Sequence, residues 1–505
     1  MSMILEGLQM IFTPGCLLIM ALGVAIGIIF GAIPGLSATM AIALFLPITF
    51  EMDAAHGIAL LLALYVGGIS GGLISAILIN IPGTAASIAT TWDGHPMALK
   101  GEAPKALGVG IVFSFLGTLF GVVLLMAIAQ PIADFAVTFS PMEYFAIGLF
   151  SMTMVIGLSG DSIVRGCIAG LFGVALGTVG LAPIDSVKRY TFGIYDMQSG
   201  FDLLPVLIGL YAVTEIFMLS KHRGEAAADM SGEVDKKSLK IKGFGFSIKE
   251  FKSQLGNLVR SSVIGAAVGI LPGIGGSAAN VLAYSASKSA SKHPEKYGTG
   301  IIDGIVASET SNNASIGGAM VPLLTLGIPG DTNTAMLLGG LIVQGLAPGP
   351  MLFSTNGSFV YAIYIALLLA SFVMLIEEFF GLRLFVKLLN IPKHILLPVI
   401  FVMCVVGAFA TNNRMFDVFS IFIFGAIGYI FNMVKLPLPP VILGFIMGPI
   451  VEEKLRSGLM YTNGNFFAFF QRPVTACFMI LTILVLVWWG VKYVRKMRSS
   501  RKTTA

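Results

Sequence analysis

The residues best suited to chemistry are polar side chains set within apolar surroundings. The most polar such run is Ser308-Glu-Thr-Ser-Asn-Asn-Ala-Ser315, which carries amides, hydroxyls and one carboxylate. Such groups are costly in apolar surroundings unless they face a cavity or a partner helix. We therefore expect Asn312 and Asn313 to bind a solute or a cation. Three roles stay open for Glu309, which are a cation ligand, a proton carrier and a helix cap.

Four Pro-Gly pairs interrupt the apolar segments of the chain. Proline removes a backbone donor and clashes with the preceding helical turn, while glycine tolerates open backbone conformations. In lipid, the backbone groups freed by such a break must be buried in protein or line a cavity. We expect hinges at these pairs, which are Pro34 and Gly35, Pro82 and Gly83, Pro272 and Gly273, and Pro329 and Gly330.

Small polar residues follow each break. The first turn of a helix directs unpaired N–H groups and the positive end of its dipole outward, so a carboxylate can bind there. Carbonyl groups freed at the preceding helix end suit a sodium ion, and Asp331 joins Glu309 as a candidate for cation coupling. The alternative is that these residues only cap helices. The candidate substrate ligands after the breaks are Ser37, Thr39, Thr84, Ser87, Ser277, Asn280, Thr332 and Asn333.

The composition places these residues in a membrane protein. Of 505 residues, 56% are hydrophobic and only 11% are charged, with a mean hydropathy of +0.90. A soluble core of this size has no place for so many apolar residues. Several uncharged stretches, such as 106–130 and 357–376, match the roughly 20 helical residues that cross a bilayer. The ten-residue alternation of β-barrel strands is absent.

Basic residues concentrate in two polar stretches. Between Lys221 and Lys252 lie eight Lys or Arg and five acidic residues, and the tail from Lys492 onward is also basic. The positive-inside rule predicts that both stretches are cytoplasmic, so the C-terminus is cytoplasmic too. We divide the chain into a first membrane repeat (1–220), a basic linker (221–256), a second membrane repeat (257–491) and a basic tail (492–505).

The two membrane parts share motifs in the same order at nearly constant separation. We infer an internal duplication, and corresponding breaks in two repeats point to a midplane binding site. The fold class expected is therefore an all-α polytopic membrane protein with two homologous repeats, broken helices or re-entrant hairpins, and about 11–12 crossings of roughly 20 residues each. We favour inverted over parallel repeats. The matched motifs are Gly31-Ala-Ile-Pro-Gly35 with Gly269-Ile-Leu-Pro-Gly273, Ile79-Asn-Ile-Pro-Gly83 with Leu326-Gly-Ile-Pro-Gly330, and Lys100-Gly-Glu-Ala-Pro104 with Gln344-Gly-Leu-Ala-Pro348.

Enzyme-like patterns are weak. Gly68-Ile-Ser-Gly71 and Gly157-Leu-Ser-Gly160 match the GxSG of intramembrane serine proteases, but the histidine base that such chemistry needs is not evident. Gly273 to Ala278 fits GxGxxA without the strand that a dinucleotide site requires, so we interpret it as an anion nest. No P-loop motif occurs. We expect no enzyme activity, no cofactor, no metal site and no nucleic-acid partner.

Further motifs carry a family resemblance, namely Tyr65-Val-Gly-Gly-Ile-Ser-Gly-Gly72, Thr91-Trp-Asp-Gly-His-Pro96 and Ser308-Glu-Thr-Ser-Asn-Asn313. With the Pro-Gly motifs they cover nearly the whole chain, which resembles the TctA family of tripartite tricarboxylate transporters. The resemblance implies a large permease subunit of the inner (cytoplasmic) membrane, partnered by a small membrane subunit and a periplasmic solute-binding protein. It implies ion-driven import of a carboxylate such as citrate, with Na⁺ or H⁺ as the coupling ion. The competing hypotheses are a channel or a permease for another small solute, and an intramembrane enzyme.

Overall fold

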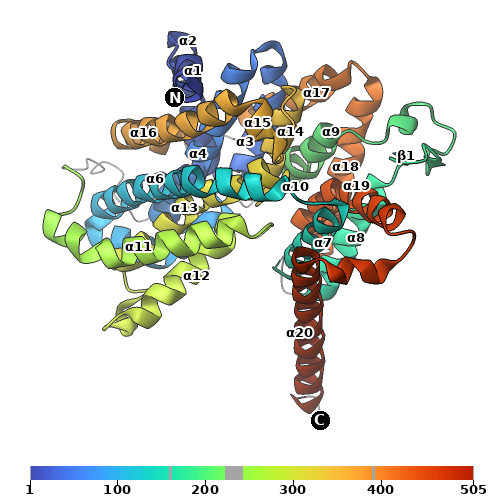
Figure 1. The fold of residues 1–505 in the computed structure, drawn as a ribbon. Helices are drawn as coiled ribbons and strands as arrows, with labels where there is room; N and C mark the ends of the chain where they lie inside the picture. The colour runs from blue at the N-terminus through green and yellow to red at the C-terminus, as the bar shows by residue number, and fades with distance from the viewer. Residues whose placement is uncertain (1, 159–161, 222–242, 274, 389–392, 504–505) are drawn as a thin grey trace.

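The chain folds almost entirely into helices joined by short loops (Figure 1). The computed structural model describes residues 2–158, 162–221, 243–273, 275–388 and 393–503. The helices of the first part are α1 (Ser2–Ile11), α2 (Pro14–Ala32), α3 (Ala38–Phe45), η1 (Leu46–Glu51), α4 (Ala54–Ile79), η2 (Ala85–Ser87), α5 (Ile88–Met97), η3 (Ala98–Glu102), α6 (Ala103–Ala136), α7 (Pro141–Leu158), α8 (Ile163–Gly177), η4 (Asp196–Ser199), α9 (Leu203–Leu207), η5 (Ile208–Val213) and α10 (Thr214–Lys221).

The second part is equally helical. Its elements are α11 (Ile248–Ile270), α12 (Gly275–Ala290), η7 (Pro294–Lys296), α13 (Ile302–Leu326), α14 (Thr332–Val343), α15 (Met351–Thr355), α16 (Gly357–Leu388), α17 (Lys393–Asn412), α18 (Met415–Met433), α19 (Leu438–Tyr461), η8 (Phe466–Gln471) and α20 (Pro473–Thr503). One short antiparallel pair, β1 (Gly180–Leu181) with β2 (Lys188–Arg189), lies in the loop after α8. The expected all-α class is confirmed.

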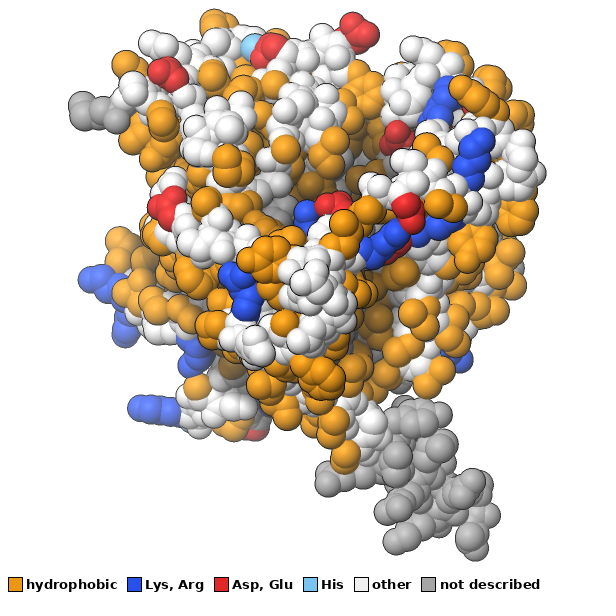
Figure 2. All heavy atoms as spheres, turned by 45° about the vertical axis from the view of Figure 1, so that its right-hand side comes forward, with side chains coloured by type: hydrophobic (Ala, Val, Ile, Leu, Met, Phe, Trp, Pro, Cys, Tyr) orange, Lys and Arg blue, Asp and Glu red, His pale blue; other side chains and the backbone are white. Residues whose placement is uncertain are grey.

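The outer surface is apolar enough to meet lipid. Figure 2 shows hydrophobic side chains over much of the visible face, and residues such as Leu18, Val123 and Phe380 are exposed. A soluble protein rarely exposes so large an apolar area. Among the described residues, seven helical segments are long and apolar enough to cross a membrane, which are 14–32, 54–79, 85–136, 203–220, 357–387, 415–433 and 473–491. The chain is a multi-pass membrane protein, and the total of crossings stays a prediction.

Each Pro-Gly pair lies between two helices. Pro34 and Gly35 separate α2 from α3, and Pro82 and Gly83 separate α4 from η2. The other two pairs separate α11 from α12 and α13 from α14. Helices α4 and α13 both end on a left-handed residue, which is Asn80 in one and Gly327 in the other. The four pairs therefore interrupt the helical backbone, and their action as hinges stays a prediction.

Helix α13 lies at the centre of a large group of helices. Every residue from Gly304 to Thr325 is buried, including the polar run that the sequence singled out. Helices α5, α6, α11 and α12 pack around it, and Figure 1 shows α6, α13 and α11 running side by side. Glycines permit the close approach, because a methyl group on Gly265 of α11 would lie 2.1 Å from the Ser311 carbonyl oxygen. The polar run therefore faces partner helices.

Helices α2 and α4 pack in a similar way. A methyl group on Gly31 would lie 2.2 Å from the Gly68 carbonyl oxygen, and one on Gly71 would lie 2.4 Å from that of Ile28. Small residues at such contacts let helical backbones approach closely in membranes. The packing of α2 on α4 thus positions the first two breaks, as that of α11 on α13 positions the other two.

A smaller group of helices is formed by α7, α8, α19 and α20, and α20 extends away from the body in Figure 1. Residues 222–242 of the predicted linker lie outside the described residues. The last part of that linker, from Ile248, belongs to α11, and the backbone of the predicted tail continues α20 to Thr503. The division into domains stays a prediction.

The glycine contact between α11 and α13 yields a matched pair of variants. We expect Gly265→Ala to cost about 1–3 kcal/mol, because the methyl group has no space. Gly256→Ala lies in the same helix with nothing within 4 Å of the new methyl, so it should be neutral or stabilise by up to about 1 kcal/mol. Thermal unfolding in detergent checks this order. Equal unfolding temperatures for the two variants would contradict the packing.

Candidate functional site

One cavity of about 330 Å³ is bordered by the segments that follow all four Pro-Gly breaks. The starts of α3, η2, α12 and α14 converge on it, and η5 supplies Tyr211. Segments from both parts of the chain therefore form one site. Of the residues predicted from the sequence, those that line it are Ser37, Thr39, Thr84, Ser277, Thr332 and Asn333, with the hinge residue Gly273 and the candidate coupling residue Asp331.

Helices α3 and α14 meet at the cavity through their first turns. The Thr39 hydroxyl donates a hydrogen bond of 2.6 Å to the Asn333 side-chain oxygen. It also lies 3.4 Å from the Thr332 hydroxyl. These residues are almost three hundred positions apart, so the contact joins the two parts of the chain at the site. The Asn333 amide nitrogen donates a long hydrogen bond of 3.4 Å to Oδ2 of Asp331.

Asp331 caps α14 and places a negative charge at the edge of the cavity. Its Oδ1 accepts from the backbone N–H and the hydroxyl of Thr334 at 2.7 and 2.8 Å. Its Oδ2 accepts from the Tyr65 hydroxyl of α4 at 2.9 Å. The capping alternative thus holds for Asp331, since it forms a capping box. The carboxylate nevertheless lines the cavity, where it suits a cation better than an anion.

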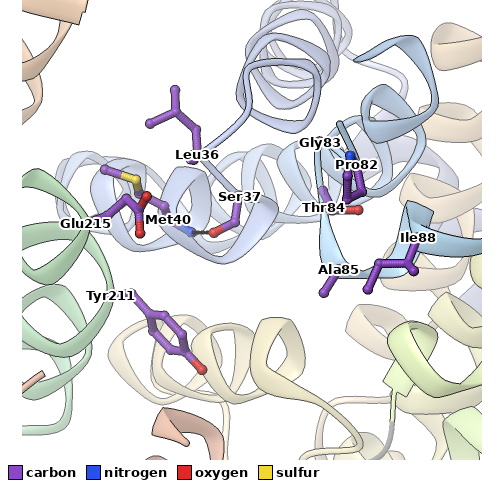
Figure 3. Close-up of a pocket in the computed structure, with 11 residues that line it drawn as sticks. Leu36, Ser37, Met40, Pro82, Gly83, Thr84, Ala85, Ile88, Tyr211 and Glu215 are labelled. Atoms are coloured by element: carbon purple, nitrogen blue, oxygen red, sulfur yellow. Dashed lines mark hydrogen bonds between the residues drawn. The ribbon is translucent and has the colours of Figure 1, made fainter. Parts of the chain in front are cut away.

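A second cavity of about 250 Å³ adjoins the first, and both include Ser37, Thr84 and Tyr211 in their walls. Figure 3 shows Ser37 and Met40 on one side, and Thr84 beside Pro82 on another. The Ser37 hydroxyl accepts from the Met40 N–H at 3.1 Å and so caps α3. The Thr84 hydroxyl lies 3.2 Å from that of Ser87. Ser37 is therefore both a helix cap and a wall residue.

Two wall residues with polar side chains were not among the candidates from the sequence. Tyr211 lies in the π-helical segment η5, and Glu215 lies in the first turn of α10 and lines the second cavity (Figure 3). A methyl group on Gly35 would lie 3.1 Å from a Glu215 carboxylate oxygen, so this acid lies against the first break. Single π-helical turns are frequent at functional sites. A lone tyrosine and a lone acid near the end of an apolar segment carry no pattern that could have identified them.

Two predicted ligands serve the packing of helices. Asn280 of α12 accepts from the Ala89 N–H at 3.1 Å and donates to the Gly276 and Ser277 carbonyl oxygens at 3.0 and 2.8 Å. It thereby ties α12 to the start of α5. Ser87 is buried beside Thr84 and does not line the larger cavity.

The candidates on α13 divide between two faces of that helix. Asn312 lies directly behind the cavity wall, because a methyl group on Gly276 would be 2.6 Å from its Oδ1. Both polar atoms of the Asn312 amide are buried without a hydrogen-bond partner among the described residues. Asn313 and Glu309 do not line the cavity. Asn313 donates to the Glu309 carbonyl oxygen at 3.0 Å and faces Thr118 of α6.

Comparison with known proteins identifies the family. Residues 17–443 match the model of the tripartite tricarboxylate transporter TctA family. The chain belongs to the TctA family. No solved structure matches it.

Two relatives come from Agrobacterium vitis. One, described as an uncharacterized 52.8 kDa protein in the TAR-I ttuC' 3' region, is 32% identical over 481 residues, which are 95% of this chain and 94% of the relative. The other, described as an uncharacterized protein in the TAR-II ttuC' 3' region, is 33% identical over 223 residues, which are 44% of this chain and 92% of the relative. The similarity to the first relative therefore spans both parts of the chain.

The TctA family is a family of transporters, and the serine-protease pattern fits it poorly. The Ser70 hydroxyl donates to the Glu378 carboxylate at 3.0 Å and not to a histidine. Ser159 lies outside the described residues. Among the described residues, no group of three His, Cys, Asp or Glu side chains is arranged to hold a metal ion.

The structural role of Asn280 in this TctA-family chain can be measured. Asn280→Ala leaves the buried Ala89 N–H without its partner, which should cost about 1–3 kcal/mol of stability. Asn432→Ala, at an exposed position of α18, is the control and should unfold at the wild-type temperature. Thermal unfolding in detergent distinguishes them, and an unchanged temperature for Asn280→Ala would show that the contact does not stabilise the fold.

Proposed function

We propose that this chain is the large permease subunit of a binding-protein-dependent secondary transporter that imports a tricarboxylate or related organic acid by ion-driven symport. Family membership supports the class of protein, and a tripartite family implies partner subunits. The observation that carries the substrate class is the cavity bordered by all four helix breaks. Its walls combine helix N-termini with neutral hydrogen-bond donors, which is the chemistry of carboxylate binding.

The anion-binding side is formed by the starts of α3 and α12. Each contributes N–H groups that lack intrahelical partners, and each directs the positive end of its dipole toward the cavity. The hydroxyls of Thr84 and Ser277 lie on the same wall, and the Thr39 hydroxyl, which donates to Asn333, holds α3 and α14 together there. No Lys or Arg is among the described residues that line the cavity. Binding through dipoles and neutral donors is strong enough to hold a carboxylate and weak enough to release it, as transport requires.

The cation-binding side is formed by Asp331. A carboxylate solute that enters the cavity is repelled by this acid unless a cation lies between them. Cation and solute then favour each other's binding, which is the thermodynamic basis of symport. Asn312, with its unpaired amide behind Gly276, is the second ligand that we assign to this side. Na⁺ or H⁺ is the coupling ion, and Asp331 and Glu309 are the coupling residues.

We further propose that the two parts are repeats of one structural unit, for which we favour an inverted arrangement, and matched contacts support the repeat. The α2–α4 and α11–α13 pairs enclose corresponding breaks. A methyl group on Gly83 would lie 2.0 Å from the Gly31 carbonyl oxygen, and one on Gly330 would lie 2.8 Å from that of Gly269. These four glycines occupy matching positions in the two repeated motifs. The same contact between successive breaks is therefore formed twice.

The setting that fits this function is the inner membrane, with the basic linker and tail in the cytoplasm. The partners are a periplasmic solute-binding protein, which delivers the carboxylate, and a small membrane subunit. The bilayer surrounds the apolar surface seen in Figure 2.

Uptake of radiolabelled citrate and succinate into proteoliposomes tests the proposal. The assay contains the permease with its small subunit and binding protein, with and without a Na⁺ or pH gradient. We expect accumulation that needs a gradient and the binding protein. Equal flux without any gradient would support the alternative, a channel or a permease for another small solute.

A charge introduced into the cavity tests where the solute binds. Asn333→Asp preserves the size of the side chain and an acceptor for Thr39. It adds a negative charge that repels a carboxylate solute in the cavity. We expect the apparent KM for uptake to rise at least about tenfold, since one factor of ten needs only 1.4 kcal/mol of repulsion. Asn432→Asp, on the exposed face of α18, should keep the wild-type KM. Wild-type kinetics in Asn333→Asp would place the solute elsewhere.

A further inference from the structure

Glu378 is a fully buried acid in the C-terminal half of α16, outside every motif described above. Its Oε2 accepts a hydrogen bond of 3.0 Å from the Ser70 hydroxyl of α4. Its Oε1 is buried and has no hydrogen-bond partner among the described residues. An unsatisfied carboxylate oxygen at this depth is expensive, so it requires an explanation.

The acid next to Glu378 on α16 is Glu377, and the basic residues of that helix, Arg383 and Lys387, lie toward its C-terminal end. Tyr65 of α4 donates to Asp331 and not to Glu378. Neither Glu378 nor Glu309 forms an ion pair with a Lys, Arg or His side chain of the described residues. The other charged side chains on the helices packed against α16 lie near helix ends with partners of their own, which are Glu6 with Ser358, His56 with Asp53, Lys105 with Glu250 and Asp134 with Gln130.

Glu309 is equally buried but has more partners. It accepts from the Thr90 hydroxyl of α5 and from the Ser114 hydroxyl of α6, the latter at 3.0 Å. A carboxylate in an apolar interior without a counter-charge is destabilised by its own burial. A proton on Glu378 removes that charge. The free Oε1 of Glu378 is an oxygen that is available to take that proton, because hydroxyl donors already occupy the bonded positions.

Resting on the proposed function, we infer that Glu378 is a buried proton-binding group that couples proton movement to solute transport. Glu378 is the proton carrier, and Ser70 is its positioning residue. A proton from one aqueous side binds the Glu378 carboxylate at Oε1 and neutralises it, and release to the other side restores the carboxylate. Helix α4 contacts this acid of α16 through Ser70, so each change of protonation alters a contact between the two parts of the chain.

Substrate-coupled proton movement tests the inference. Proteoliposomes that hold the complete transporter and a trapped pH-sensitive dye receive carboxylate on the outside with no imposed gradient. We expect wild type to acidify the lumen as solute enters. Glu378→Gln keeps a partner for Ser70 but cannot carry a proton, so the proton signal should fall at least about tenfold, whereas exchange of internal for external labelled solute continues.

Glu453→Gln is the matched control, because Glu453 is a partly exposed acid of α19 paired with Lys454. It should keep both the proton signal and uptake. Ser70→Ala should shift the pH optimum of uptake and retain exchange, as expected for a positioning residue. A wild-type proton signal in Glu378→Gln would overturn the assignment.

A second readout does not depend on any variant. Carbodiimides modify protonated carboxyl groups in apolar surroundings, so dicyclohexylcarbodiimide should label Glu378 in wild-type protein, as detected by mass spectrometry of the peptide. Absence of label at Glu378 would count against the proton site even if Glu378→Gln failed to fold. Uptake driven by Na⁺ with no proton signal would overturn this inference alone, whereas no gradient-dependent carboxylate uptake at all would overturn the proposed function.

Discussion

The structure depends on one constraint, which is that a backbone freed from its helix inside a membrane must find partners in the protein. The breaks satisfy this by packing on one another. The Gly273 N–H donates to the Gly330 carbonyl oxygen at 2.6 Å. The Gly83 N–H donates a longer hydrogen bond, 3.4 Å, to the Gly72 carbonyl oxygen. Glycine is needed at Gly83 because any side chain there would clash with the Gly31 carbonyl oxygen. The starts of the following helices are then left to face a shared cavity.

Helix α13 connects the cavity with the buried acids. Asn312 lies behind the cavity wall at Gly276, and Glu309 reaches α5 and α6 from the same helix. Helix α12 carries that wall and is tied to α5 by Asn280. Under the proposed function, a solute that moves α12 also acts on the contacts of Glu309. This linkage is a second route between solute and ion, beside the cation proposed between the solute and Asp331.

Much of this arrangement could be predicted from the sequence, since the four Pro-Gly pairs within the apolar segments interrupt helices and small polar residues mark the next helix start. The uses of individual residues could not. Asn280 and Thr39 look alike as polar residues after a break, yet the first holds α12 to α5 and the second lines the cavity. Tyr211 stands alone in an apolar segment, and Glu378 has only Glu377 beside it in one. Their hydrogen-bond and cavity neighbours come from the packing of distant helices. Whether Asn313 binds a solute is a prediction that its position against α6 leaves untested.

The central claim is that breaks from the two parts meet at one site, and a cross-link tests it most directly. In a background without the native cysteines, Thr39→Cys and Thr332→Cys place sulfur atoms where hydroxyl oxygens now lie 3.4 Å apart. Mild oxidation in membranes should form an internal disulfide, identified by mass spectrometry, and should block uptake until it is reduced. The account is contradicted if this pair forms no more disulfide than Thr39→Cys with Ser354→Cys, which lies on the exposed face of α15.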